Sequence, residues 1–161
     1  MRPAWPAIGL VALLTAAGCG GSSSGGAAAQ TTPTASATAP ADPAAATAQI
    51  TTTWQTLFHT GTKPAVALTL LENGDSLRGA IRIATKIQRQ QKVTEDAKVS
   101  KVTFTSPTTA TVNYELLSHG QALLPNATGQ AVLQNGVWKV SQSTFCTLVQ
   151  LGAGGTKVPG C

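Results

Sequence analysis

The sequence has only two histidines and three cysteines among its 161 residues, and this scarcity limits the chemistry it can carry. His59 and His119 lie far apart in the chain, and no cysteine or carboxylate stands near them at the spacing of a metal site. The residue spacing matches neither a Ser/His/Asp arrangement nor a glycine-rich phosphate loop. We therefore expect no metal, no cofactor and no catalytic residue, and we interpret both histidines as surface residues.

A long apolar run is also missing. The apolar stretch near the N-terminus covers about eleven residues, whereas a membrane-spanning helix needs roughly twenty. It ends in Ala16-Ala17-Gly18-Cys19, which is typical of a bacterial lipoprotein signal. We expect residues 1–18 to be a signal peptide and the Cys19 thiol to carry a diacylglyceryl group with palmitate-like chains. The alternative is an ordinary secretory signal cut near Ala17, which would leave Cys19 unmodified.

The segment after Cys19 is nearly devoid of charge. It consists almost wholly of Gly, Ser, Ala, Thr and Pro, with Asp42 as its one charged residue. Such a composition cannot bury enough apolar surface to offset chain entropy, so residues 19–46 are predicted to be a disordered tether. The two acyl chains of a diacylglyceryl group on Cys19 would hold the protein on a membrane far more firmly than one chain could. We expect a single domain, residues 47–161, held on the outer face of the bacterial plasma membrane, in the cell envelope.

Charge and cysteine number support export. The chain carries 11 basic and 6 acidic residues, a net charge of +5 that falls to +4 once Arg2 is removed with the signal. This is compatible with anionic lipid or cell-wall phosphate nearby, and we expect no nucleic-acid partner. With Cys19 lipidated, Cys146 and Cys161 remain as an even pair in an oxidising compartment, which predicts a disulfide. Two free thiols are the alternative.

Apolar residues at helical spacing predict three helices between residues 43 and 91. They cover residues 43–59 around Trp54, a short segment from Pro64 to the Asn73-Gly74 stop, and residues 76–91. The third has one apolar and one basic face, the latter formed by Arg78, Arg82, Lys86 and Arg89. A solvated face explains this row, and a contact for anionic headgroups or a phosphate-bearing polymer is the alternative.

After Asp96 the pattern changes to strict alternation, which predicts antiparallel strands near 102–105, 110–116, 128–133 and 137–145. Turn residues separate them at Ser106-Pro107, at 118–120 and at Asn135-Gly136, the last being the strongest hairpin signal. The predicted fold is α+β, with three N-terminal helices packed on a curved four-stranded antiparallel meander.

The folded part resembles the low-molecular-weight secreted antigen family of mycobacteria and related actinobacteria. The matching segments are TW at 53–54, LLENG at 70–74, SPTTATV at 106–112, LPN at 124–126, TGQAV at 128–132, NGVWKVS at 135–141 and TFC at 144–146. The resemblance implies an exported envelope protein and a variation on the nuclear transport factor two (cystatin-like) cone. The best-known members look simply secreted, whereas this chain has a lipoprotein signal.

Enzymes built on that cone place a carboxylate or histidine in an apolar pocket. Here Tyr114 shares the inward face with Val112, while Glu115 points the other way. We therefore expect a non-catalytic module that binds a small apolar ligand or a partner protein, with Trp54 and Tyr114 as candidate pocket wall. One alternative is an adhesive or structural envelope protein that uses the basic face. The other is an isomerase- or cyclase-type enzyme, which a carboxylate or histidine buried beside Tyr114 would favour.

Overall fold

The computed structural model describes residues 38–91 and 95–161. The predicted signal peptide, Cys19 and the tether up to residue 37 lie outside the described residues. The elements are α1 (Pro43–Phe58), α2 (Pro64–Thr69), the 3-10 turn η1 (Gly74–Leu77), α3 (Arg78–Gln91), β1 (Glu95–Ser106), β2 (Thr109–Ser118), β3 (Gln121–Gln134), β4 (Val137–Val140) and α4 (Gln142–Gly152). Within the described ranges, no helix has the length and apolar character needed to cross a membrane.

Helix α1 begins inside the segment assigned to the tether. The Asp42 carboxylate accepts a hydrogen bond from the Ala45 amide at 2.9 Å, and Pro43 occupies the first turn, where its missing N–H costs nothing. Ala46 is already part of the core, with 5% of its surface exposed. The ordered body therefore begins near Asp42, and residues 43–46 form the first turn of α1 instead of tether.

The four strands form one antiparallel sheet in the order β1-β2-β3-β4, so the predicted meander is confirmed. Two of its hairpins close with two-residue turns, His119-Gly120 and Asn135-Gly136, in which both residues have positive φ. These turns match the right-handed twist of the paired strands. The α+β class and the hairpin positions thus follow from the sequence pattern.

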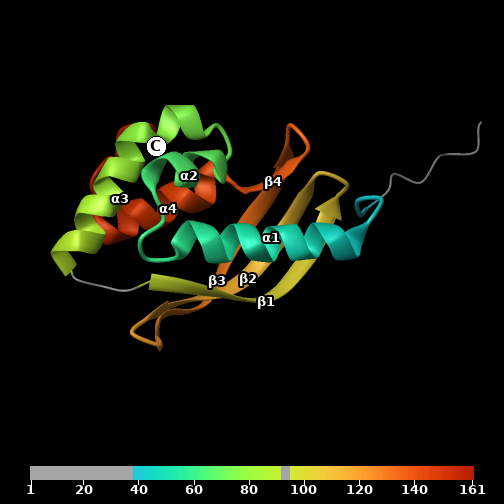
Figure 1. The fold of residues 1–161 in the computed structure, drawn as a ribbon, viewed down its shortest axis with the longest axis horizontal. Coiled ribbons are helices and arrows are strands. Elements are labelled where there is room, and N and C mark those ends of the chain that lie inside the picture. The colour runs from blue at the N-terminus through green and yellow to red at the C-terminus, as the bar shows by residue number, and fades with distance from the viewer. Residues whose placement is uncertain (1–37, 92–94) are drawn as a thin grey trace, which may run out of the picture. The chain divides into compact units, whose positions relative to one another are not determined.

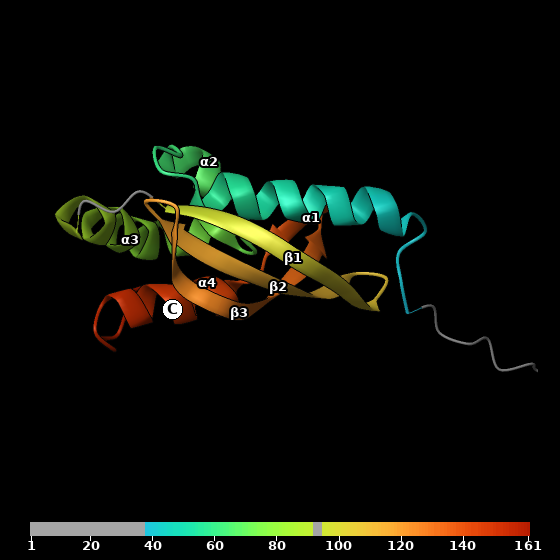
Figure 2. The same cartoon turned by 90° about the horizontal axis from the view of Figure 1, so that it is seen from below.

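One face of the sheet is buried. Along β2, Ala110, Val112, Tyr114 and Leu116 are buried, whereas the residues between them are partly exposed. Helix α1 lies along this sheet in both views (Figures 1 and 2). Its Trp54 meets Tyr114 edge to face, with ring centroids 6.0 Å apart. The contact of α1 with β2 therefore forms the centre of the core.

The strand expected over residues 137–145 is wrong in its second half. β4 ends at Val140, and helix α4 follows from Gln142 to Gly152. The Ser141 hydroxyl caps this helix by accepting a hydrogen bond from the Thr144 amide at 3.2 Å. Phe145 and Val149, four residues apart, then turn inward. The expected set of three helices therefore omits a helix after the sheet.

The helices α2, α3 and α4 gather at the end of α1 that carries Phe58 (Figures 1 and 2). The segment after α2 also covers the free edge of β4, because the Glu72 amide donates to the Val140 carbonyl and the Val140 amide to the Leu70 carbonyl, both at 2.9 Å. Covering an edge strand in this way removes a site for unwanted pairing. The same segment leads directly into the turn that starts α3.

Gly129 lets α4 approach the sheet. A Cβ at this position would lie 2.6 Å from the Thr144 Cγ2 and 3.2 Å from a Tyr114 ring carbon. We expect Gly129→Ala to lower the free energy of unfolding by about 1–3 kcal/mol, as overpacking does in other cores. Urea denaturation of the folded domain measures this loss.

Two variants control this prediction. In Gly152→Ala the new methyl group meets only Ile87 side-chain atoms at 3.7 Å, which is ordinary contact, so its stability should stay near the wild-type value or rise. Adding Thr144→Ser to Gly129→Ala removes the clashing methyl group and should recover stability. Equal losses in Gly129→Ala and Gly152→Ala would contradict the packing explanation.

Candidate functional site: an apolar pocket below α3 and α4

A pocket of about 320 Å³ opens where the C-terminal end of α1 meets α2, α3, α4 and the β2–β3 hairpin. Its wall is mainly apolar, and each of these elements contributes to it: Leu57, Phe58, Ala67, Ile81, Ala84, Ile87, Leu116, Leu124, Leu148 and Val149. A volume near 300 Å³ is at the lower end of ligand pockets, and an apolar wall with few polar groups is their usual composition.

Two exposed leucines mark the mouth of this pocket. Leu123 of β3 and Leu151 of α4 line it while remaining 54% and 64% exposed. Large apolar side chains grouped at the rim of a cavity are a feature of binding surfaces, whereas isolated ones are ordinary. The pocket therefore continues into an apolar rim that a ligand or partner can cover.

Glu95 is the carboxylate among the described residues that line the pocket, and sequence analysis missed it. Its side chain is partly buried, and Gln88 of α3 donates a hydrogen bond to it at 3.3 Å. Burial raises the pKa of the Glu95 carboxyl, and the Gln88 hydrogen bond lowers it in part. The first residue of β1 thus places one titratable group in an otherwise apolar wall.

Backbone pairing explains why Glu95 faces the pocket. The Thr60 amide donates to the Glu95 carbonyl at 3.0 Å, and the Glu95 amide donates to the Thr60 hydroxyl. Glu95 also precedes Ala97 and Val99 on the same side of β1, both turned toward the core. A register shift between Val99 and Lys101 separates this alternation from that of Val102 and Phe104, so the predicted strand at 102–105 could not indicate the orientation of Glu95.

Neither histidine provides an obvious acid–base group in the pocket. His59 lines its edge, but its imidazole is 65% exposed and its Nδ1 lies 2.8 Å from the Asp96 carboxylate. His119 lies in the β2–β3 turn and is exposed. No cluster of three or more histidine, cysteine or acidic residues that could hold a metal occurs within residues 38–91 and 95–161.

Trp54 and Tyr114, the candidate pocket wall, are both part of the core, and Tyr114 also lines a separate hollow between the sheet and α4. Their exposed fractions are 0% and 1%, and neither lines the pocket next to Glu95. Burial raises the pKa of Tyr114 to about 12. The strand register places Val99, not Glu95, opposite Tyr114, so the carboxylate is not beside this tyrosine. Phe58 stacks on Tyr114 at 6.0 Å and also lines the pocket, which makes it the link between core and pocket.

The four residues of the basic face of α3 differ in whether they form an ion pair. Arg78 forms an ion pair with Asp75 at 2.6 Å. Arg82, Lys86 and Arg89 are exposed and, within the described residues, form no ion pair with a carboxylate. Three of the four predicted residues thus remain available to an anion.

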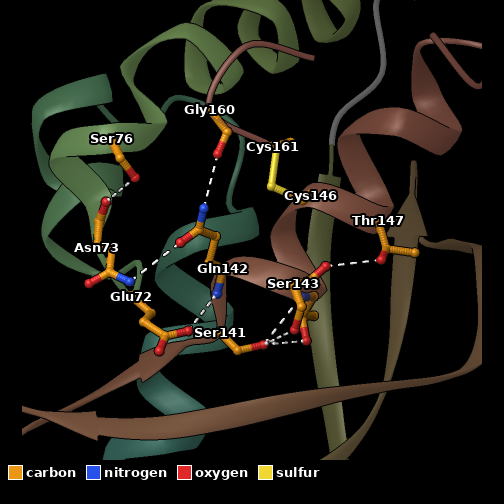
Figure 3. Close-up of a disulfide and its surroundings, with 11 residues drawn as sticks. Glu72, Asn73, Ser76, Ser141, Gln142, Ser143, Cys146, Thr147, Gly160 and Cys161 are labelled. Carbon is orange, nitrogen blue, oxygen red and sulfur yellow. Dashed lines mark hydrogen bonds between the residues drawn. A yellow bond between two sulfur atoms is a disulfide. The ribbon is translucent and has the colours of Figure 1, made fainter. Parts of the chain in front are cut away.

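A disulfide holds α4, one wall of the pocket, to the C-terminus. Cys146 and Cys161 are bonded as predicted. Figure 3 shows Gln142 beside them, with its amide donating to the Glu72 carboxylate and its side chain donating to the Gly160 carbonyl, both at 3.0 Å. The start of α4, the turn before η1 and the end of the chain are therefore joined at one place.

A family model for the C-terminal domain of low molecular weight antigen MTB12 matches residues 43–156. The match begins at the first residue of α1 and runs beyond the end of α4. It therefore includes the sheet and every helix that contributes to the pocket. No curated protein and no solved structure matches the chain.

The disulfide should contribute a large part of the domain's stability. Replacing both cysteines, Cys146→Ser with Cys161→Ser, opens a link between residues 15 apart, which costs about 3 kcal/mol in the chain-entropy model. Urea unfolding measures the loss, and faster amide exchange in α4 would show that this wall has loosened. Cys19→Ala serves as the control and should leave the unfolding free energy unchanged. A loss below about 1 kcal/mol would contradict the prediction.

Glu95 should make stability depend on pH. Because its pKa is raised on folding, the folded state holds the proton more tightly, and the stability gained from the neutral form is lost as pH rises through the folded pKa. Glu95→Gln mimics that neutral form. Its melting temperature should match the wild type at about pH 3.5 and exceed it at about pH 7.

Glu115→Gln is the matched control for Glu95→Gln, because Glu115 lies on the neighbouring strand outside the pocket, 4.0 Å from Lys98. The difference between the two variants isolates the effect of the pocket from that of losing one surface charge. A lower melting temperature of Glu95→Gln at about pH 7 would show that the ionised carboxylate stabilises the fold.

Proposed function

Because the chain belongs to the family of low molecular weight antigen MTB12, whose C-terminal domain it contains, we propose that it is an exported, lipid-anchored, non-catalytic module that binds a small apolar ligand in this pocket. The observation that carries the proposal is the cavity of about 320 Å³ with an apolar wall and an apolar rim. The ligand enters past Leu123 and Leu151, the exposed leucines of that rim.

Export and anchoring are supported by two independent features. The apolar run that ends in Cys19 has the form of a lipoprotein signal, and the Cys146–Cys161 disulfide is of the kind that persists in oxidising compartments. In this proposal residues 1–18 are removed, Cys19 carries the lipid, and the tether ends where Asp42 caps α1. The domain then works on the outer face of the plasma membrane.

Binding without catalysis is favoured by the polar groups of the pocket. Acid–base enzymes usually place two titratable groups side by side, one with a raised and one with a lowered pKa, so that one acts as acid and the other as base. Here Glu95 is joined by the amide of Gln88, and the nearby His59 imidazole faces Asp96 and solvent. We further propose that the helices and meander are a variation on the nuclear transport factor two cone, a fold that holds ligands between its helices and its sheet.

Mass spectrometry of the full chain from an actinobacterial host tests both parts of the proposal. Under denaturing conditions the mature protein should begin at Cys19 and carry the mass of a diacylglyceryl group, which Cys19→Ala should lose. Under native conditions a small apolar molecule should accompany the protein, or the neutral probe N-phenyl-1-naphthylamine should bind with enhanced fluorescence. Ala84→Trp, which fills the pocket from α3, should reduce that binding at least tenfold.

Ala48→Trp is the control, because Ala48 is exposed on α1 and lies outside the pocket. It should bind the probe like the wild type. An unmodified Cys19 in the mature protein would refute the anchor. Probe binding that survives Ala84→Trp in a protein with wild-type circular dichroism would refute the pocket.

A further inference from the structure

We propose that the ligand of the pocket is an amphiphile with an anionic phosphate head, whose apolar chain fills the pocket and whose head is bound by Arg82, Lys86 and Arg89. The inference rests on the proposed function and names the chemical class of the ligand. In this inference the basic face of α3 binds the head group of the ligand, whereas a merely solvated helix face would bind none.

The pocket and the basic face share a wall. A second hollow beside α3, more open than the pocket, is lined by Pro64, Thr85, Arg82, Lys86, Arg89 and Gln90. Pro64 and Thr85 also line the apolar pocket. A molecule with its chain in the pocket can therefore pass over Pro64 and Thr85 and place its head among the three cations.

The charges of this hollow favour an anion. Arg82, Lys86 and Arg89 stand on successive turns of one helix, so their like charges repel one another when nothing lies between them. Arg78, one turn earlier, differs because it pairs with Asp75 and does not line the hollow. Guanidinium groups bind phosphate oxygens in pairs, and a lysine adds a third positive charge. A phosphate head would relieve the repulsion.

The Glu95 carboxylate favours the alternative, a ligand whose head group is cationic. Its carboxylate lines the same pocket and would attract a cationic amphiphile or repel an anionic one. It faces Gln88 and the apolar residues of the pocket, and His59 lies at the edge of the pocket with Asp96. Removing its charge therefore distinguishes the two possibilities, since Glu95→Gln weakens binding of a cationic head and leaves or strengthens binding of an anionic one.

Isothermal titration with ten-carbon probes tests the head group. The protein is the exported chain with Cys19→Ala, so that no acyl chain of its own competes. Decyl phosphate should bind at least tenfold more tightly than decanol, while inorganic phosphate alone should bind too weakly to measure. The triple variant Arg82→Glu, Lys86→Glu, Arg89→Glu should remove the advantage of decyl phosphate and leave decanol binding unchanged.

A second triple variant provides the matched control. Lys98→Glu, Lys101→Glu, Lys157→Glu changes the net charge by the same amount at exposed lysines outside both hollows, and decyl phosphate binding should remain at the wild-type level. Circular dichroism monitors folding. If the glutamate variant of α3 unfolds, replacement of the same three residues by glutamine takes its place and should also remove the advantage.

The outcomes separate this inference from the proposed function. Equal binding of decanol and decyl phosphate would overturn the anionic head and leave the apolar pocket standing. Tighter binding of decyltrimethylammonium that is lost in Glu95→Gln would overturn it in favour of a cationic head. Failure of all ten-carbon probes to bind, or binding that Ala84→Trp leaves unchanged, would overturn the pocket itself.

Discussion

The packing of Trp54 against Tyr114 is the contact on which the rest of the structure depends. It joins α1 to the middle of the buried sheet face, and both rings are almost fully enclosed. Next to it, the Thr53 hydroxyl donates to the Trp138 carbonyl at 3.0 Å and ties the same helix to β4. The chain has only three tryptophans, three phenylalanines and one tyrosine. Three of these seven aromatic residues, Trp54, Phe58 and Tyr114, pack together in this part of the core. Aromatic pairs of this geometry add stability beyond the area they bury.

The pocket follows from where this core ends. Phe58 stacks on Tyr114 from the last position of α1, and beyond it the sheet face continues to Leu116 and Leu124 without further cover from that helix. α3 and α4 close over this remainder, and the segment 72–73, Gln142 and the C-terminal residues are joined beside the disulfide (Figure 3). Gly129 allows α4 to start close to the sheet, where the Thr144 hydroxyl accepts a hydrogen bond from the Gln130 amide at 2.8 Å. The pocket wall is thus attached to the core at one end and to the C-terminus at the other.

Local sequence pattern predicted the parts of this molecule that are regular and failed where two elements adjoin. The meander, its hairpin turns and the amphipathic α3 have one consistent period each. The strand predicted over residues 137–145 joined two different elements: the alternation of β4 ends at Val140, and the polar residues 141–144 are the Ser141 cap and the first turn of α4. The candidate pocket wall shows another limit of the sequence pattern. An inward aromatic such as Tyr114 belongs to a core or to a pocket according to what covers it, and here Trp54 and Phe58 of α1 pack against its ring. Glu95 was missed because β1 begins well before the predicted strand at 102–105, and a register shift between Val99 and Lys101 changes which residues face inward.

The joining of an apolar pocket to a basic hollow follows from the geometry of a single helix. Residues of α3 advance about 100° around its axis, so Ile81, Ala84 and Ile87 face inward while Arg82, Lys86 and Arg89 form a strip on the opposite side, with Thr85 on the flank between them. A ligand that extends from the pocket across this flank reaches the outer strip. If that strip carries alternating charges, as on most surface helices, the edge is electrically neutral. In α3 no described residue from Arg78 to Gln90 is acidic, so the charged side chains that line the hollow beyond Thr85 are all cations. The charge row that alone indicates nothing more than a solvated face lies, in this fold, beside an apolar pocket, and the proposed binding of a phosphate head rests on that position.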